Sequence, residues 1–199
     1  MFTGIIEEVG ELQASEGGEL VVGCTVVLEG TQLGDSIAVN GVDLTARRID
    51  ADALVFDVMP ETFRRSTLGE LPVGAPLNLE RSVRPSDRLS GHLVRGVVET
   101  TATLESLTPE ADALIARYRV PSAYMRYIVT KGPVCVDGAS LTVIARDDEG
   151  FAVSLVQYTQ QHTNLTSRTP GDRINLETDI VARYVEQLVE PLLAERDRA

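Results

Sequence analysis

Residues 35–80 of this 199-residue chain return as residues 132–177 at a constant offset of 97, and this duplication restricts the possible folds more than any other feature. The segment VNGVDLT (39–45) corresponds to VDGASLT (136–142). The register then pairs Thr62 with Thr159, Ser66 with Thr163, Thr67 with Asn164, Leu68 with Leu165, Gly74 with Gly171, Asn78 with Asn175, Leu79 with Leu176 and Glu80 with Glu177. Further upstream, GIIE (4–7) resembles GVVE (96–99) at an offset of 92. The chain is therefore two tandem copies of one small domain.

Each copy has the pattern of short strands separated by turns. SIAVNG (36–41) and VCVDG (134–138) end in Asn-Gly and Asp-Gly, which favour tight hairpins. A further alternating strand is predicted at 53–58 and 151–156, and Pro and Gly at 72–74 and 170–171 precede a last strand. Several short strands at even spacing predict a small closed or half-closed barrel in each copy, because closure removes exposed sheet edges.

Two segments lie outside this pattern. SAYMRYI (122–128) predicts a short helix whose counterpart in the first copy is missing or degraded. From Asp179, the predicted N-cap, apolar residues recur at helical spacing as far as Leu193, and Pro191 should kink or end this helix. This helix either packs on its own domain or contacts another subunit. The predicted domains are residues 1–88 and 89–178, followed by a helix at 179–199.

Composition narrows the class of function. A formal net charge of −12, from 30 acidic and 18 basic residues, argues against a nucleic acid partner, and the basic residues at 80–88 are interpreted as a solvated connector. Cys24 and Cys135 are too few for a disulfide framework and lack metal-ligand spacing, so we expect them to be buried and expect no metal site. No leader or long apolar run is present, which predicts a cytoplasmic protein with no membrane partner.

Six segments carry a family resemblance: MFTGIIEEVG, SIAVNGVDLT, TLGELPVGAPLNLE, SGHLVRGVVE, VDGASLTV and NLETDIVARYVEQL. Together they resemble the riboflavin synthase family of tandem lumazine-binding domains over essentially the whole chain. The resemblance implies an all-β fold of two six-stranded Greek-key barrels with a C-terminal oligomerisation helix. It also implies a homotrimer, with sites between the N-terminal barrel of one subunit and the C-terminal barrel of the next.

The reaction implied by the resemblance is the dismutation of two 6,7-dimethyl-8-ribityllumazine molecules. One donates a four-carbon unit to the other, giving riboflavin and 5-amino-6-ribitylaminopyrimidinedione, and no cofactor is implied. Duplication suits this chemistry, because two identical substrates must be held face to face in different roles. One loses a proton from its 7-methyl group and the other accepts a nucleophile at C7, with proximity supplying much of the rate.

Matching motifs assign the residues of two pockets. The first is expected to contain Gly4, Ile5, Ile6, Asp43, Leu44, Thr45, Asp57, Val58, Met59, Glu61 and Thr62, with Ser36 as a further substrate-binding candidate. The second is expected to contain Gly96, Val97, Val98, Lys131, Ser140, Leu141, Thr142, Ser154, Leu155, Gln157 and Thr159. A polar ring with a ribityl chain needs hydroxyls, amides and a few charges in an apolar pocket. Singly, these serines and threonines are ordinary strand residues, and only their repetition singles them out.

The chain departs from the family pattern at two reactive positions. Asp43 stands where most members have a cysteine, and Val97 stands where a second histidine usually follows His92. The catalytic candidates are therefore Asp43, Ser140, Thr142 and His92. Asp43 is a candidate base or charge stabiliser, a ligand hydrogen-bonding group, or a cap of the Asn40-Gly41 turn. His92 either orients a substrate or satisfies a backbone carbonyl, and His162 is expected to be solvated.

Four functions stay open at this point. The favoured one is an enzyme that makes riboflavin, followed by a protein that binds a lumazine or flavin without turnover. The third is related chemistry on a modified lumazine. The last is an interaction module with an empty pocket, which ranks lowest because such a module has no reason to retain hydroxyls at matched positions in both copies.

Overall fold

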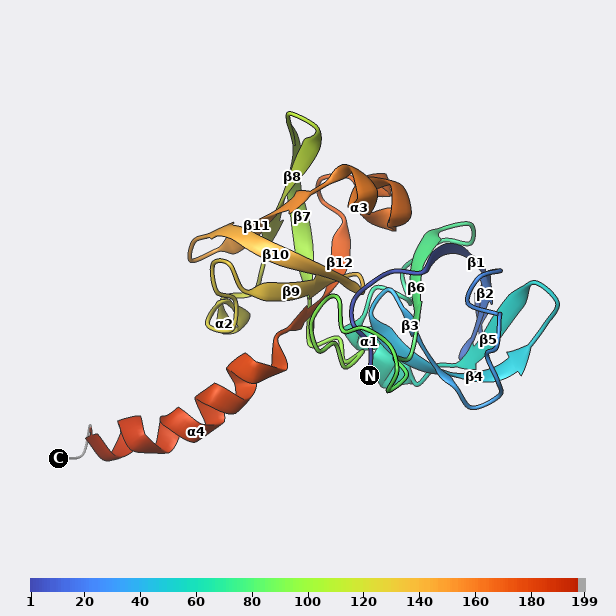
Figure 1. The fold of residues 1–199 in the computed structure, drawn as a ribbon, viewed down its shortest axis with the longest axis horizontal. Coiled ribbons are helices and arrows are strands. Elements are labelled where there is room, and N and C mark those ends of the chain that lie inside the picture. The colour runs from blue at the N-terminus through green and yellow to red at the C-terminus, as the bar shows by residue number, and fades with distance from the viewer. Residues whose placement is uncertain (197–199) are drawn as a thin grey trace.

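The N-terminal half of the chain forms a closed six-stranded antiparallel barrel. We describe residues 1–196 from a computed structural model, shown in Figure 1. The strands of this barrel are β1 (Glu8–Glu16), β2 (Glu19–Gly23), β3 (Ser36–Val39), β4 (Val42–Ile49), β5 (Ala53–Asp57) and β6 (Pro76–Arg81). They follow one another around the barrel in the order β1-β2-β5-β4-β3-β6.

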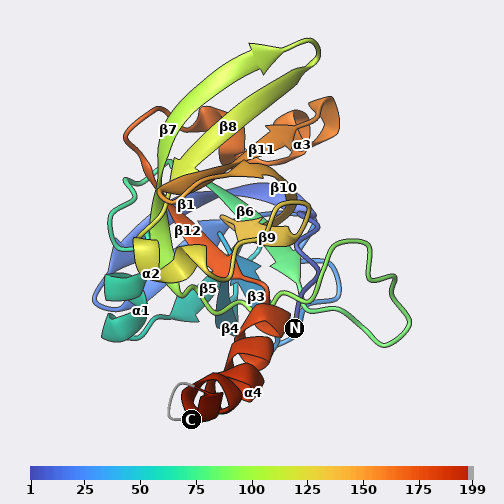
Figure 2. The ribbon, with the colours of Figure 1, turned by 90° about the vertical axis from the view of Figure 1, so that its left-hand side faces the viewer.

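A second closed barrel repeats this order. Its strands are β7 (Thr100–Glu110), β8 (Ala113–Arg119), β9 (Pro133–Val136), β10 (Ala139–Arg146), β11 (Gly150–Leu155) and β12 (Arg173–Thr178). The order β10-β11-β8-β7-β12-β9 is the order of the first barrel when that barrel is read from the equivalent strand β4 in the opposite direction. The predicted fold class, two tandem six-stranded barrels, is confirmed. The hairpin of β7 and β8 is the long one that rises beyond its barrel in Figure 2.

The Asn-Gly and Asp-Gly signals mark real hairpins. Asn40 and Gly41 link β3 to β4 with φ of 45° and 76°, and Asp137 and Gly138 link β9 to β10 with φ of 42° and 85°. Two successive positive φ angles define the type I′ turn, whose twist matches that of the flanking strands. Glycine is required at the second position, because a Cβ on Gly41 would lie 2.8 Å from the backbone nitrogen of Gly138. The two turns therefore meet at the contact between the barrels.

A set of buried asparagines joins the barrels around an approximate two-fold axis. The side-chain amide of Asn78 donates to the carbonyl of Asp137 (2.8 Å), and that of Asn175 donates to the carbonyl of Asn40 (2.9 Å). The four residues are at most 1% exposed. Buried amides need partners, and the amide groups of Asn78 and Asn175 find theirs on the other barrel. These contacts fix the two copies relative to each other.

The helices are short, apart from the last. They are α1 (Pro60–Arg65), α2 (Ser122–Met125), α3 (Gln157–His162), a 3₁₀ turn (Asn164–Ser167) and α4 (Ile180–Arg196). The helix predicted at 122–128 is present but shorter. Asp179 caps α4 by accepting from the amide of Val181 at 3.0 Å, as expected. The helix does not end at Pro191, and the predicted segment 197–199 lies outside the described residues.

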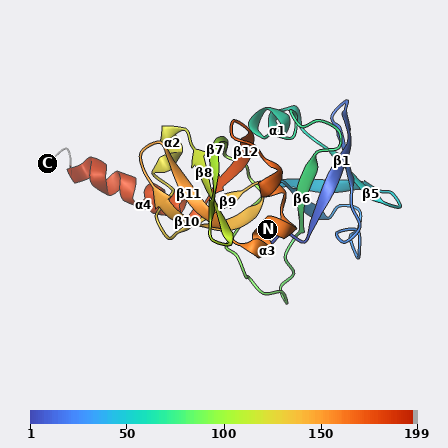
Figure 3. The ribbon, with the colours of Figure 1, turned by 90° about the horizontal axis from the view of Figure 1, so that it is seen from above.

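Helix α4 extends away from the C-terminal barrel. In Figures 1 and 3 it lies at the opposite end of the molecule from the N-terminal barrel. Its apolar side chains are therefore largely uncovered in a single chain, and those of Val181, Tyr184, Val185 and Leu188 are all more than half exposed. In the part of the chain that the structure describes, no helix is both long and apolar enough to span a bilayer.

Candidate functional site

Strands β4 and β10 present the same arrangement of polar side chains on the outside of each barrel. Asp43 and Thr45 are exposed on β4, while Leu44 between them is buried. On β10, Ser140 is half-buried and Thr142 exposed, and Leu141 between them is buried. Successive strand residues face opposite sides, so the leucines support the barrel cores and the hydroxyls and carboxylate face outward. Each barrel thus has one candidate site.

Residues 1–6 and 91–98 cross between the two sites. The carbonyl of Gly4 accepts from the amide of Ser140 (2.8 Å), and the carbonyl of Gly96 accepts from the amide of Asp43 (2.9 Å). Ile6 packs against the core of the second barrel. Val98 packs against the core of the first. The grouping predicted from the sequence is therefore wrong in this respect: Gly4, Ile5 and Ile6 border the Ser140 site, and Gly96, Val97 and Val98 border the Asp43 site. The sequence suggested that each segment belongs to the barrel that follows it along the chain. A crossing between the barrels leaves no local signal in the sequence that would indicate otherwise.

Each site has exposed apolar side chains beside its polar groups. Met59 follows β5 and is 70% exposed, and Val97 on the crossing segment beside Asp43 is 50% exposed. Their counterparts beside the second site are Val156 and Ile5, which are 55% and 44% exposed. Apolar walls beside a few hydroxyls and a carboxylate are the composition expected of a site for a polar aromatic ring.

The second site contains a histidine that the first lacks. Nδ1 of His92 lies 2.7 Å from Oγ of Ser140, and the amide of His92 donates to the carbonyl of Thr3. Burial lowers the pKa of His92 below its usual 6.5, and Asp179 opposes this effect. Nε2 is buried without a partner among the described residues. A neutral imidazole bonded to a serine hydroxyl can orient that hydroxyl or exchange a proton with it.

In the first site, the carboxylate of Asp43 takes the position that Ser140 has in the second. The Asp43 side chain is exposed and makes no hydrogen bond within the part of the chain that the structure describes. It makes no hydrogen bond with the Asn40-Gly41 turn in the described residues, so the cap, one of the three interpretations offered by the sequence, is not seen there. His162 is exposed as expected, with its ring stacked on Tyr158 at 3.9 Å between centroids.

The other predicted residues fall into two groups. The side chains of Val58 and Leu155, like those of Leu44 and Leu141, are at most 8% exposed, so they form the wall behind a site and not its open face. Asp57, Glu61, Lys131 and Gln157 are exposed, and Ser36, Thr62, Ser154 and Thr159 are half-buried.

Some of these polar side chains already have partners. Asp57 lies 3.2 Å from the guanidinium of Arg47. Glu61 pairs with Arg65 and Arg64 on α1, and these contacts lower the pKa of Glu61. Ser36 is aligned with Thr45 across β3 and β4. Lys131 has a positive φ of 68° just before β9, and its amide donates to the carbonyl of Val143.

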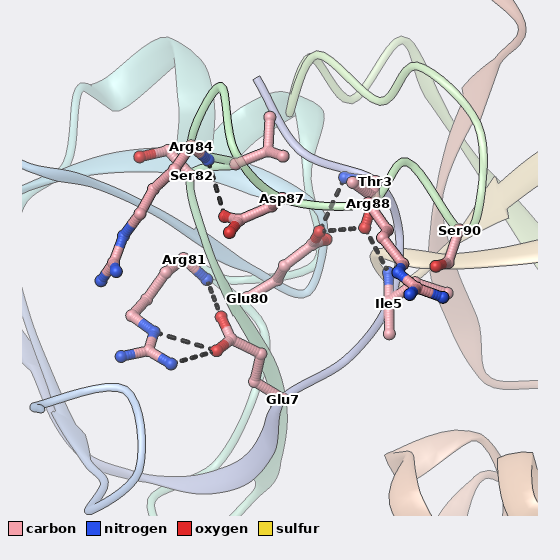
Figure 4. Close-up of a pocket in the computed structure, with 11 residues that line it drawn as sticks. Thr3, Ile5, Glu7, Glu80, Arg81, Ser82, Arg84, Asp87, Arg88 and Ser90 are labelled. Atoms are coloured by element: carbon pink, nitrogen blue, oxygen red, sulfur yellow. Dashed lines mark hydrogen bonds and ion pairs between the residues drawn. The ribbon is translucent and has the colours of Figure 1, made fainter.

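A pocket of about 320 Å³ opens where the N-terminal segment meets β6 and the connector, as Figure 4 shows. Ile5 and Thr3 line it on one side, and the side chains of Arg81, Arg84 and Arg88 lie around it. Glu7 pairs with Arg81 there. The connector, interpreted as merely solvated, thus forms one wall of a pocket next to Ile5. In the described residues, no group of His, Cys, Asp and Glu side chains is arranged to hold a metal ion.

Two buried carboxylates were not singled out from the sequence. Glu80 and Glu177 are the last residues but one of β6 and β12 and are only 4% and 2% exposed. Both accept hydrogen bonds from the crossing segments. The sequence did contain a signal for them: the same acidic residue occurs in both copies, at the offset of 97, inside an otherwise apolar strand.

The comparisons with known proteins agree with this geometry. The family model described as the lumazine binding domain matches residues 3–82 and 95–179. The riboflavin synthase of Actinobacillus pleuropneumoniae is 44% identical over 95% of this chain and 90% of that protein. The riboflavin synthase of Mycobacterium bovis is 43% identical over 95% of this chain and 98% of that protein.

Solved structures show the same fold with ligands. The crystal structure of LumP complexed with riboflavin aligns with a TM-score of 0.79 and 28% identity, covering 89% of this chain and 99% of that one. LumP complexed with 6,7-dimethyl-8-(1'-D-ribityl) lumazine aligns equally well, at 25% identity over the same shares of the two chains. The chain therefore belongs to the riboflavin synthase family of enzymes, built from two lumazine binding domains.

Proposed function

We propose that this protein makes riboflavin by dismutation of two 6,7-dimethyl-8-ribityllumazine molecules. The observation that carries the proposal is the pair of related but unequal sites on one chain. Asp43 stands in one site on β4, and Ser140, at the equivalent position of β10, is paired with His92 in the other. Two identical substrates with different roles need two such sites. In one role a substrate loses a proton from its 7-methyl group, and in the other it accepts a nucleophile at C7.

The chain's own groups can supply the binding and proton transfer that this reaction needs. Thr45 and Thr142 offer hydroxyls to the ring or the ribityl chain, and the exposed apolar side chains beside them cover the ring faces. Asp43 serves as a general base or stabilises developing positive charge. Holding both rings together supplies much of the rate, and the transfer of carbon between two copies of one molecule calls for no added cofactor.

We further propose that the protein is a homotrimer whose sites are completed between subunits. Asp43, Thr45 and Thr142 are exposed in the single chain, which leaves room for a second barrel to close over a ligand. Helix α4 carries uncovered apolar side chains and suits a contact between subunits. The predicted cytoplasmic location belongs to the same proposal.

The test is to incubate the purified protein with 6,7-dimethyl-8-ribityllumazine and to follow riboflavin by its absorbance near neutral pH. We expect product well above the uncatalysed rate. Asp43→Asn should lower turnover by about a hundredfold or more, the usual contribution of a positioned acid or base. Asp50→Asn, which changes an exposed carboxylate after β4, is the matched control and should leave turnover unchanged. An unaltered rate in Asp43→Asn would remove Asp43 from the mechanism.

A second function is favoured by a specific observation. Asp43 and Val97 replace the cysteine and histidine of the family pattern, and LumP, a structural neighbour, has been crystallised with riboflavin and with the lumazine. A protein that binds these molecules without turnover, or that acts on a modified lumazine, would keep the same polar residues. Tight binding without product in the same assay would establish binding alone.

A further inference from the structure

The crossing segments are tied to each other at the contact between the barrels. Phe2 and Val94 form an antiparallel bridge, in which the amide of Phe2 donates to Val94 at 2.7 Å and the amide of Val94 donates back at 3.1 Å. With Ala38 and Cys135 these side chains form a small buried cluster. The cluster repeats the approximate two-fold relation of the barrels, since Ala38 and Cys135 are equivalent positions. The two segments are thus joined at one point between the sites, and each has its own anchor beyond that point.

A buried carboxylate of the first barrel holds the N-terminal segment. Oε1 of Glu80 accepts from the amide (2.6 Å) and the hydroxyl (2.7 Å) of Thr3, and Oε2 accepts from the amide of Gly4 (2.9 Å), as Figure 4 shows in part. The carbonyl of this same Gly4 then receives the amide of Ser140 in the second barrel. Burial raises the pKa of Glu80 and the three donors oppose that rise. Glu80 therefore acts across the interface, on the site of the other barrel.

Glu177 repeats this arrangement in the opposite direction. Its Oε1 accepts from the amide of Arg95 (2.8 Å) and its Oε2 from the amide of Val97 (2.8 Å). The guanidinium of Arg95 adds a third contact at 3.2 Å. The carbonyl of Gly96, between these two residues, receives the amide of Asp43 in the first barrel.

We propose that Glu80 and Glu177 are positioning residues, each of which fixes the segment bordering the ligand site of the other barrel. The assignment of the two borders as ligand sites rests on the proposed function. Each carboxylate offers only acceptors to a set of donors, so glutamine in its place brings an NH₂ group against a backbone N–H and loses at least one charge-assisted hydrogen bond. The segment, and with it the site across the interface, should then loosen.

Residue-resolved amide hydrogen exchange on the full chain tests this crossed relation directly. In Glu80→Gln we expect exchange at Ser140 to quicken by about tenfold while Asp43 keeps its rate, because local opening at one border frees only the amide bonded there. In Glu177→Gln we expect the reverse, faster exchange at Asp43 with Ser140 unchanged. A merely stabilising carboxylate would instead affect the amides of its own barrel or both sites alike, and either pattern would overturn the proposal, as would unchanged rates.

Glu8→Gln is the matched control. Glu8 also accepts two amides and one hydroxyl, from Thr25 and Val27, but it holds only a loop of its own barrel. Exchange at Ser140 and Asp43 should not change in this variant. If Glu80→Gln does not fold, Thr3→Val removes one of the three donors to Glu80 and should quicken exchange at Ser140 by a smaller factor. Unaltered exchange in a folded Thr3→Val would then refute the proposal.

Turnover separates this inference from the proposed function. If the unaltered protein makes riboflavin, both glutamine variants should lose about tenfold in turnover, since a loosened site holds its substrate in the reacting geometry less often. Glu8→Gln should retain full turnover. A crossed exchange pattern in a protein that makes no riboflavin would overturn the proposed reaction and leave the positioning role of the two carboxylates in place.

Discussion

At the scale of single residues, His92 gives the Ser140 site a proton-binding group with a defined pH response. Burial is the main cause that lowers its pKa below 6.5, and the charge of Asp179 acts in the other direction. Just below pH 6.5, His92 therefore binds a proton in the unfolded chain but stays neutral in the folded chain. The stability due to this neutral imidazole is complete above 6.5 and is lost as the pH falls through the lowered value.

A thermal unfolding series for wild type and His92→Gln isolates this contribution. As the pH falls from 7.5 to about 5, the melting temperature of the wild type should drop more steeply than that of the variant. The difference between the two proteins removes the effects of all carboxylates that both share. Parallel curves over this range would show that the histidine titrates in the folded state as it does in the unfolded one.

The buried ion pair of Asp137 and Arg168 is present in the second copy only, so the first copy shows which uncharged residues can take its place. Asp137 is fully buried, and Arg168 donates to it at 2.8 Å. The equivalent positions of the first copy hold Asn40 and Leu71, with no charge. Arg168→Leu alone should cost about 3–5 kcal/mol of unfolding free energy, because it strands a buried carboxylate. Denaturant titration measures the loss.

Asp137→Asn combined with Arg168→Leu copies the pair found in the first barrel. This double variant should recover most of the lost stability, since neither charge then stays buried alone. A double variant as unstable as Arg168→Leu would mean that the arginine contributes through its packing and not through its charge.

At the scale of elements, helix α4 carries the prediction about assembly. Leu188 is 74% exposed, in line with the uncovered Tyr184 and Val181, and a contact between subunits would bury all three. Leu188→Asp should convert the proposed trimer to monomers in sedimentation analysis while the barrels unfold at an unchanged temperature. Gln187→Asp adds the same charge to the neighbouring exposed position and should leave the assembly intact. A protein that is already monomeric at working concentration would contradict the trimer.

The elements also show how far the sequence alone could reach. Period-two strands and the Asn-Gly and Asp-Gly turns, repeated at the offset of 97, predicted a small closed or half-closed barrel in each copy, because strands and turns are encoded by residues close in sequence. The number of strands in each barrel came from the family resemblance. The crossing of residues 1–6 and 91–98 was not predictable in this way. Both segments read as starts of their own barrels, and only long-range hydrogen bonds to Ser140 and Asp43 place them on the other one.

The site was partly predictable for the same reason. Thr45, Ser140 and Thr142 were identified by matching family motifs and by their place in the repeated strands β4 and β10, and Asp43 by its place in the family motif, where a cysteine is usual. Burial of the leucines between them followed from strand alternation only once the outward face was known. The role of Glu80 depends on donors more than seventy residues away, and no spacing rule relates the two.

At the scale of the whole molecule, the two-fold relation of the barrels predicts how many ligands one chain binds. The turns at Asn40 and Asp137 place β4 and β10 as equivalent strands on either side of one interface. Each strand is bordered by a segment anchored in the opposite barrel. Both sites have their polar side chains on β4 or β10, so each should bind one flavin ring. Isothermal titration calorimetry with riboflavin should therefore give two molecules per chain.

Variants of single sites then identify what each barrel contributes. Thr45→Val removes a hydroxyl from the first site and Thr142→Val the matching one from the second, so each should weaken one of the two binding events and spare the other. A stoichiometry of one, lost in only one of these variants, would mean that a single barrel binds while the other has become structural. Such a chain has no second site for a second lumazine, and the binding protein would then be the better description, because dismutation requires two substrates at once.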